Sequence, residues 1–351
     1  MSVDERFFTA LEPQSAVQIA QLVKGEIAKQ SLAQAENKLF AGVAALKIAQ
    51  SMHISFFYAQ SYSQVAQNTQ AGLVLTTEDL ASCLPQSSCL IYVKDPQLAF
   101  AKLCALFYQE KHKIQGIHPQ ALIAKTAQLG DNVCVGAGAY VGENAQIGAG
   151  TVIHPQAYVG DGVTIGRDCV IAPQASVRFA HLGNKVRLLA GARIGERGFG
   201  YVKDSFGAIE VPQLGRVIIE DNVEVGANST IDRGTVQDTK IGYGTMIDNM
   251  VMIGHNCQIG RFVAIIGKAS IGGSAIVEDF AYIGGVSSIS GHKTISKGAR
   301  VNACSFIISD VPEKATMNGF PALEGKTAFK MIALLRKMLK KGETKAVSPK
   351  P

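Results

Sequence analysis

No run of about 18 or more uncharged apolar residues occurs among the 351 residues, which excludes a helix that spans a membrane. The start of the chain has no basic segment followed by an apolar one, so no secretory signal is expected. The seven cysteines are odd in number and form no CxxC pair, which argues against disulfides and against a zinc site. We therefore expect reduced thiols and a cytoplasmic location.

A branched aliphatic residue at every sixth position is the strongest signal that is present. The series runs unbroken from Ile117 to Val177 and again from Ile241 to Ile307, with a slip before Leu182. A period of six predicts short flat strands, separated by tight corners where Gly or Asn adopts a positive φ angle. Three strands close a coil of about 18 residues, and about ten coils at a spacing of ~4.8 Å form a parallel β-helix.

Two segments interrupt this register: residues 194–219, and residues 231–241, where four residues are extra. Long loops on a compact repeat are more often functional than decorative, so we expect these two to serve the site. A tolerated surface insertion is the alternative for both.

The sequence predicts three parts: an α/β domain over 1–113, the β-helix over 114–310, and a basic helical tail over 311–351. In the first part we expect helices near Ser15–Ser31 and Leu98–Glu110. This part has no GxGxxG sequence and no P-loop, which argues against a Rossmann or NTPase module.

The positive charge is concentrated in the tail. From Lys326 to Pro351 there are eight Lys or Arg and one Glu, a net +7, whereas the whole chain carries +6. No recognition module with interleaved aromatics accompanies this charge, which argues against nucleic acid as a partner. The tail is either a docking surface for an acidic partner protein or a solvated end of the chain.

His255 differs from the other histidines in what lies above it. One and two coils further on are Gly273 and Gly291, and their neighbours are also Gly or Ser. A bare wall beside an imidazole suggests a slot for a long thin substrate, with the Gly273 N–H as an oxyanion donor and His255 as a general base. His292 would stand ~10 Å from His255 by strand spacing, which favours a contact with substrate.

No histidine spacing matches the three ligands of a γ-type carbonic anhydrase, so neither a metal nor another cofactor is expected. No GxSxG motif occurs, and Cys257 is interpreted as an ordinary strand residue. Direct acyl transfer is therefore favoured over a covalent acyl-enzyme.

Several motifs carry a resemblance to a known family: Gly198–Tyr201, Gln213–Ile219, Thr230–Gly234, Ile247–Asn249 and Gly254–Asn256. The chain resembles, over nearly its whole length, the UDP-3-O-(3-hydroxyacyl)glucosamine N-acyltransferases of lipid A synthesis. The resemblance implies a left-handed β-helix, an N-terminal domain of uridine-binding type and a homotrimer with sites between adjacent prisms.

The resemblance also implies a set of roles. The donor is an acyl-carrier-protein thioester, and the acceptor is a UDP-linked 3-O-acylglucosamine. His255 matches the base that takes a proton from the 2-amine, and Gly273 matches the oxyanion donor. His292 matches a second histidine that contacts substrate, and Asp248 orients groups near the base.

Phe56 and Tyr62 match the aromatic pair that holds the uracil. Ala59 stands where the family has an Asn, and Gln60 is the amide nearest to it.

The resemblance further implies that Cys304 and Phe306 stand near the end of the acyl channel, where relatives can carry methionines. Two other functions stay open. One is an acetyl- or O-acyltransferase acting on a sugar nucleotide, and the other is a non-catalytic or lipid-binding prism.

Overall fold

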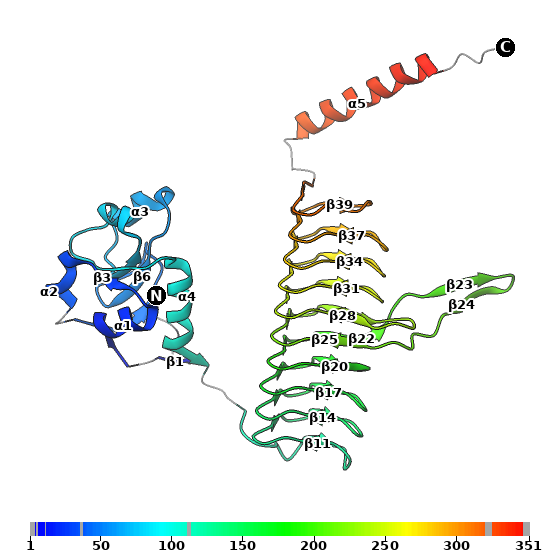
Figure 1. Ribbon diagram of the computed structural model, residues 1–351, viewed down its shortest axis with the longest axis horizontal. Coiled ribbons are helices and arrows are strands. Elements are labelled where there is room, and N and C mark those ends of the chain that lie inside the picture. The colour runs from blue at the N-terminus through cyan, green and yellow to red at the C-terminus, as the bar shows by residue number, and fades with distance from the viewer. Residues whose placement is uncertain are drawn as a thin grey trace. The chain divides into compact units, whose positions relative to one another are not determined.

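The computed structural model describes residues 4, 6–10, 12–35, 38–110, 114–319 and 325–346. The chain divides into two compact units, Met1–Lys113 and Ile114–Pro351. Figure 1 shows helices around a small sheet in the first unit and a stack of flat coils in the second. Residues 347–351, the end of the predicted basic tail, lie outside the described residues.

The first unit is an α/β fold, as expected. Its main sheet has the order β3-β8-β7-β6-β5, with β3 antiparallel to β8 and the other pairs parallel. The strands are β3 (Glu26–Ile27), β5 (Gly42–Val43), β6 (His53–Phe56), β7 (Leu73–Thr76) and β8 (Cys89–Tyr92). Two-stranded pairs are β1 (Phe8–Ala10) with β9 (Tyr108–Glu110) and β2 (Gln14–Ser15) with β4 (Leu39–Phe40). The helices are α1 (Ala16–Val23), α2 (Leu32–Ala35), α3 (Ser63–Gln67) and α4 (Pro96–Phe107).

The expected helix over Ser15–Ser31 is wrong in its extent, because α1 ends at Val23. Lys24 takes a left-handed conformation with φ 54° and closes the helix. A Cβ on Gly25 would lie 2.6 Å from the Ile91 side chain, so only glycine lets the chain pass from the helix into the sheet here.

The second unit is the predicted parallel β-helix, built from three parallel sheets of ten, nine and ten strands. The first sheet contains β10 (Leu122–Ile123), β13 (Tyr140–Val141), β16 (Tyr158–Val159), β19 (Ser176–Val177), β22 (Arg193–Arg197), β27 (Thr230–Arg233), β30 (Met252–Ile253), β33 (Ser270–Ile271), β36 (Ser288–Ile289) and β39 (Phe306–Ile307). The second contains β11 (Gln128–Leu129), β14 (Gln146–Ile147), β17 (Thr164–Ile165), β20 (Ala180–Leu182), β25 (Val217–Ile219), β28 (Thr239–Ile241), β31 (Gln258–Ile259), β34 (Ile276–Val277) and β37 (Thr294–Ile295). The third contains β12 (Cys134–Val135), β15 (Val152–Ile153), β18 (Val170–Ile171), β21 (Arg187–Leu188), β26 (Glu224–Val225), β29 (Met246–Ile247), β32 (Ala264–Ile265), β35 (Tyr282–Ile283), β38 (Arg300–Val301) and β40 (Thr316–Met317).

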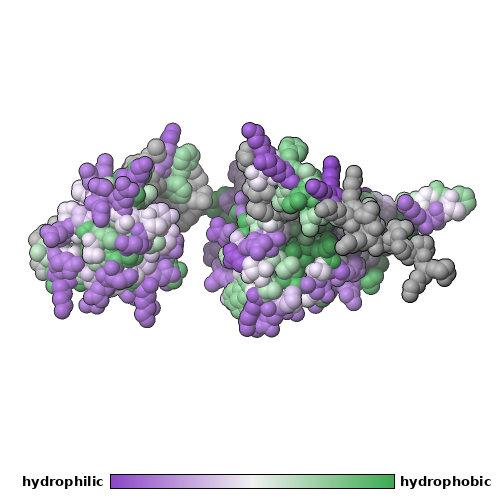
Figure 2. All heavy atoms as spheres, turned by 90° about the horizontal axis from the view of Figure 1, so that it is seen from above, coloured by the Kyte–Doolittle hydropathy of each residue, from purple (hydrophilic) through white to green (hydrophobic). Residues whose placement is uncertain are grey.

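The repeated aliphatic residues fill the inside of this prism. Ile153, Ile171 and Leu188 stack on successive coils and are fully buried, and burial of each such side chain contributes ~1.5–3 kcal/mol. Seen from above, apolar residues gather in the middle of the prism and polar residues lie around them (Figure 2). The predicted slip is a coil of 17 residues, in which Thr164 pairs with His181.

The expectation that glycine at the corners supplies positive φ angles is only partly confirmed. Positive φ angles do occur at corner residues such as Asn132 and Gly138. The glycines that directly follow the aliphatic positions instead have ordinary φ angles and lie against the next coil. A Cβ on Gly148 would be 2.5 Å from the carbonyl carbon of Gly166, so these positions need glycine for close approach rather than for backbone conformation.

The first interruption contains an antiparallel hairpin of β23 (Tyr201–Asp204) and β24 (Gly207–Glu210), which extends away from the prism (Figure 1). The predicted tail begins with β40, which still belongs to the third sheet, and continues as α5 (Gly325–Ala346), with exposed Phe329, Ile332 and Leu335 on it. No helix among the described residues is long and apolar enough to cross a membrane.

Candidate active site

His255 lies at the corner that follows β30, where the first sheet turns into the second. Ile253 pairs with Ile271 and Ile271 with Ile289, so Gly273 and Gly291 follow His255 on the next two coils, as the 18-residue period predicts. A Cβ on Gly273 would lie 2.7 Å from Nε2 of His255 and 2.9 Å from Cε1. The imidazole therefore rests against a bare Cα atom.

Gly198 packs against the Cδ2 edge of the His255 imidazole. It follows β22 in the first interruption, and a Cβ on it would lie 2.8 Å from Cδ2 of His255. The half-buried imidazole is thus enclosed by two glycines from segments that are 75 residues apart in the numbering. Sequence reasoning missed Gly198 as a site residue, although its Gly-Phe-Gly-Tyr motif was noted.

Asn256 is the hydrogen-bond partner of the imidazole. Nδ1 of His255 lies 2.9 Å from Oδ1 of Asn256. The same oxygen accepts the Thr235 N–H at 3.0 Å, and the Asn256 amide nitrogen donates to the Gln237 carbonyl at 3.0 Å. The side-chain amide of Asn256 therefore links the second interruption, residues 231–241, to the imidazole by hydrogen bonds.

The Gly273 N–H has no hydrogen-bond partner within the part of the chain that the structure describes. A Cβ on Gly254 would lie 2.8 Å from the Gly273 nitrogen, so glycine at 254 leaves that nitrogen uncovered on one side. A donor in this position is what a developing oxyanion requires.

His292 directly follows Gly291, the residue that stands two coils from His255. Its side chain is exposed, its φ angle is 58°, and its N–H donates to the Gly273 carbonyl at 3.0 Å. Among the described residues no hydrogen bond joins the two imidazoles.

Asp248 lies at a different edge of the prism, the corner between the third and first sheets that follows β29. Its carboxylate accepts the N–H groups of Gly267 at 2.9 Å and Asn249 at 2.7 Å. Asp248 therefore holds its own corner together and has no hydrogen bond to His255.

Asp232 is a charged neighbour that sequence reasoning did not single out. It lies on β27, paired in register with Glu196 of β22. Burial raises the pKa of its carboxyl to about 6, which the nearby His255 opposes and Glu196 reinforces. The signal that could have found it is the Thr-Ile-Asp-Arg-Gly motif, which opens the second interruption and contains Asp232.

Cys257 lies inside the core, two residues from the imidazole. Burial raises the pKa of its thiol to about 12, and the thiol donates to the Gly272 carbonyl at 3.2 Å. A buried thiol of this kind is not a nucleophile. The interpretation of Cys257 as a strand residue is wrong by one position, because it directly precedes β31.

In the first unit, the expected aromatic pair has a third ring between its members. Phe56 packs on Phe100 of α4 with ring centroids 4.5 Å apart, and Tyr62 is exposed. Tyr58 lies 5.7 Å from Phe56 and 5.6 Å from Tyr62. Sequence reasoning missed Tyr58, because it does not belong to the family pattern that brought out the other two.

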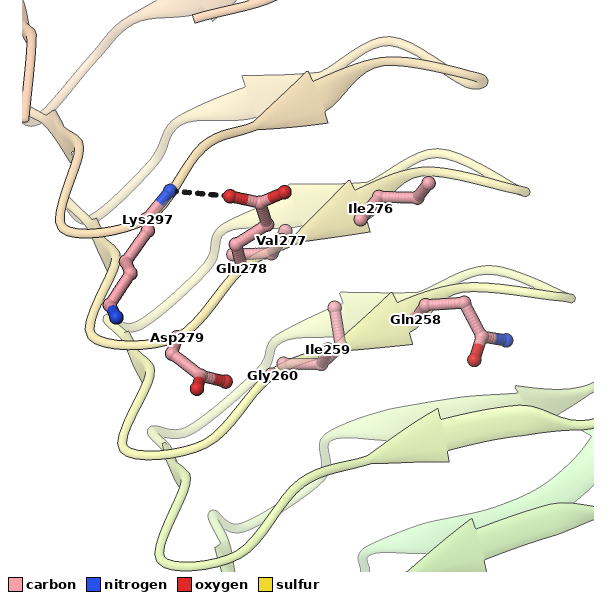
Figure 3. Close-up of a pocket in the computed structure, with 8 residues that line it drawn as sticks. All are labelled: Gln258, Ile259, Gly260, Ile276, Val277, Glu278, Asp279 and Lys297. Atoms are coloured by element: carbon pink, nitrogen blue, oxygen red, sulfur yellow. Dashed lines mark hydrogen bonds between the residues drawn. The ribbon is translucent and has the colours of Figure 1, made fainter. Parts of the chain in front are cut away.

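A groove of about 370 Å³ runs along the second sheet, between Gln258, Ile276 and Lys297 (Figure 3). The dashed line in Figure 3 joins the backbone N–H of Lys297 to the Glu278 carboxylate, at 2.8 Å. The groove starts three residues after His255 but does not include it. His255 instead lies in the corner lined by Gly198 and Gly273.

Among the described residues, no group of three or more His, Cys, Asp or Glu could hold a metal ion.

Two family models match parts of the chain. Residues 39–106 match the family model described as UDP-3-O-(3-hydroxymyristoyl) glucosamine N-acyltransferase, and residues 144–179 match the bacterial transferase hexapeptide model. The solved structure of an Arabidopsis UDP-N-acetylglucosamine acyltransferase is 23% identical, with a TM-score of 0.48, over 58% of this chain and 71% of that chain.

The curated relatives are closer. The UDP-3-O-acylglucosamine N-acyltransferase of Granulibacter bethesdensis is 41% identical over 96% of this chain and 98% of its own length. UDP-3-O-acylglucosamine N-acyltransferase 2 of Rhodopseudomonas palustris is 43% identical over 81% of this chain and 78% of its own length. On this evidence the chain belongs to the family of UDP-3-O-acylglucosamine N-acyltransferases.

Proposed function

We propose that this protein transfers a 3-hydroxyacyl chain from an acyl-carrier-protein thioester to the 2-amine of UDP-3-O-(3-hydroxyacyl)glucosamine, in the cytoplasm and as a homotrimer. The observation that carries the proposal is the imidazole of His255 enclosed by Gly198 and Gly273. Family membership supplies the substrate class, since the curated relatives are named for this acceptor.

The chemistry follows from this arrangement. The amine nitrogen attacks the thioester carbonyl carbon and forms the C–N bond, while Nε2 of His255 takes the proton that the nitrogen loses. The carbonyl oxygen becomes an oxyanion, which the Gly273 N–H stabilises. The C–S bond then breaks, and the thiolate leaves with the proton that His255 returns.

His292 contacts the substrate from the coils above the base, where it is exposed. Asp248 lies at another edge of the prism, so its contact with substrate requires the site of an adjacent copy in the trimer. Phe56 and Tyr62 hold the uracil in the first unit.

The donor protein docks on α5. Lys326, Lys330, Arg336 and Lys337 lie on this helix, and their side chains are exposed. Acyl carrier protein is acidic, so this surface attracts it by charge.

The proposal is tested with the purified full chain and four substrate pairs. An amino-sugar or a hydroxy-sugar UDP acceptor is combined with a hydroxyacyl acyl carrier protein or with acetyl-CoA. We expect an amide product only from the amino-sugar acceptor and acyl carrier protein. Transfer to the hydroxy-sugar, or from acetyl-CoA alone, would indicate a different sugar-nucleotide transferase, and no transfer at all would indicate a non-catalytic prism.

A further inference from the structure

The amide of Asn256 has only one possible orientation. A backbone N–H can only donate and a carbonyl oxygen can only accept. The Thr235 N–H therefore meets Oδ1 of Asn256, and the Gln237 carbonyl meets its amide nitrogen, both at 3.0 Å. Exchange of the two amide atoms would set donor against donor and acceptor against acceptor.

This orientation decides where the proton of the imidazole lies. Oδ1 of Asn256 is 2.9 Å from Nδ1 of His255, and an amide oxygen can only accept. Nδ1 must then carry the hydrogen. In the neutral ring the lone pair is on Nε2, the nitrogen that faces Gly273.

The segment that orients the amide is closely packed. The Asn256 N–H donates to Oγ1 of Thr239 at 2.8 Å. A Cβ on Gly234 would lie 1.6 Å from the Gln237 carbonyl oxygen, and a Cβ on Gly215 would lie 2.3 Å from it. The carbonyl that accepts from Asn256 is therefore held between two glycines and cannot turn away at low cost.

We propose that Asn256, oriented by residues 234–239, is a positioning residue that fixes His255 in the tautomer with hydrogen on Nδ1. This assigns a task to the second interruption of the repeat, which presents Thr235 and Gln237 to the amide. A neutral amide orients the ring without adding a charge beside it. The catalytic consequence rests on the proposed function, whereas the tautomer itself does not.

Asn256→Gly is the most direct variant, because Asn256 has a φ angle of 62° and glycine adopts that conformation without strain. We expect kcat to fall on the order of 10²-fold with little change in KM. Without the amide, the imidazole of His255 would spend part of its time in the other tautomer or turned away, and general-base catalysis would weaken. The matched control is Asn228→Gly, which has a similar φ of 56° at another corner and should leave kcat unchanged. An equal loss in both variants would overturn the proposal.

A second arm measures the tautomer without any assay of turnover. Imidazole ¹⁵N NMR spectra of the full-length protein separate the two neutral tautomers, and His255→Gln assigns the signal. We expect hydrogen on Nδ1 in the wild type and a mixture in Asn256→Gly. Hydrogen on Nε2 in the wild type would overturn the proposal, whether or not the protein proves to be an acyltransferase.

A third variant, Asn256→Asp, keeps the acceptor for Nδ1–H and adds a negative charge. A carboxylate beside the ring favours the imidazolium form, so the acidic limb of the kcat/KM profile should move to higher pH. A profile that coincides with that of the wild type would contradict a direct contact between residue 256 and the base.

Discussion

The imidazole of His255 occupies the space that a side chain at Gly273 would need: a Cβ there would lie 2.7 Å from Nε2. Gly273→Ala should therefore push the ring away from the reacting atoms while keeping the N–H at 273. We expect kcat to fall by about 10²-fold, the usual cost of a displacement of ~1 Å in an active site.

The matched control for this variant is Gly285→Ala, at the corresponding position of another corner, where the nearest atom to a Cβ is 3.2 Å away. Its thermal unfolding and turnover should stay close to those of the wild type. Normal turnover in Gly273→Ala would contradict the placement of the reaction at this glycine.

Asp232 makes stability depend on pH near the site. The pKa of its carboxyl is about 6 in the fold against an ordinary 3.8, so the folded state holds the proton more tightly than the unfolded chain. The contribution of protonated Asp232 to the free energy of unfolding is fully present below about pH 4 and is lost as the pH rises through 6. For a partly exposed group we expect an effect of ~1 kcal/mol.

Asp232→Asn removes this titration. Its melting temperature relative to the wild type should rise between pH 4 and pH 7, as thermal unfolding at both pH values would measure. A constant difference across that range would show that the carboxyl titrates normally.

Tyr62 is exposed, and in the proposed function it stacks on the uracil. Stacking of a base on an aromatic ring is worth ~1–3 kcal/mol, so Tyr62→Ala should raise the KM for the UDP acceptor roughly tenfold and leave kcat unchanged. The control is Tyr158→Ala, an exposed tyrosine on β16. If kcat fell and KM did not, the role in acceptor binding would be rejected.

Phe306 ends a row of outward side chains on the first sheet. Met252, Ser270, Ser288 and Phe306 pair in register on four successive strands. Three strand spacings make ~14 Å between the coil of the base and that of Phe306. In Phe306→Ala we expect longer hydroxyacyl donors to be used better, as mass spectra of products from mixed donors would show. An identical product distribution would mean that Phe306 does not limit the chain.

The β-helix was predictable because one coil repeats the same physical constraint. Residues such as Ile253 and Ile271 must all point inward, so the period fixes their register and places Gly273 after His255. The hairpin of β23 and β24 was not predicted. Its residues are exposed in the structure, so no burial pattern in the sequence marks them as strands.

The partners of the base were predictable only in part. Gly273 followed from the period, but Gly198 and Asn256 depend on how the two interruptions fold back on the corner. The two contacts that orient the side-chain amide of Asn256 are with the N–H of Thr235 and the carbonyl of Gln237, backbone groups that every residue except proline carries in full. Side-chain identity therefore gives no sign of them.

The most direct measurement is the rate of amide formation from hydroxyacyl acyl carrier protein in His255→Ala, beside His118→Ala at a corner near the start of the prism. We expect His255→Ala to lose on the order of 10²–10⁴ in kcat while it stays folded, and His118→Ala to keep its rate. Turnover by folded His255→Ala at the rate of the wild type would contradict the account.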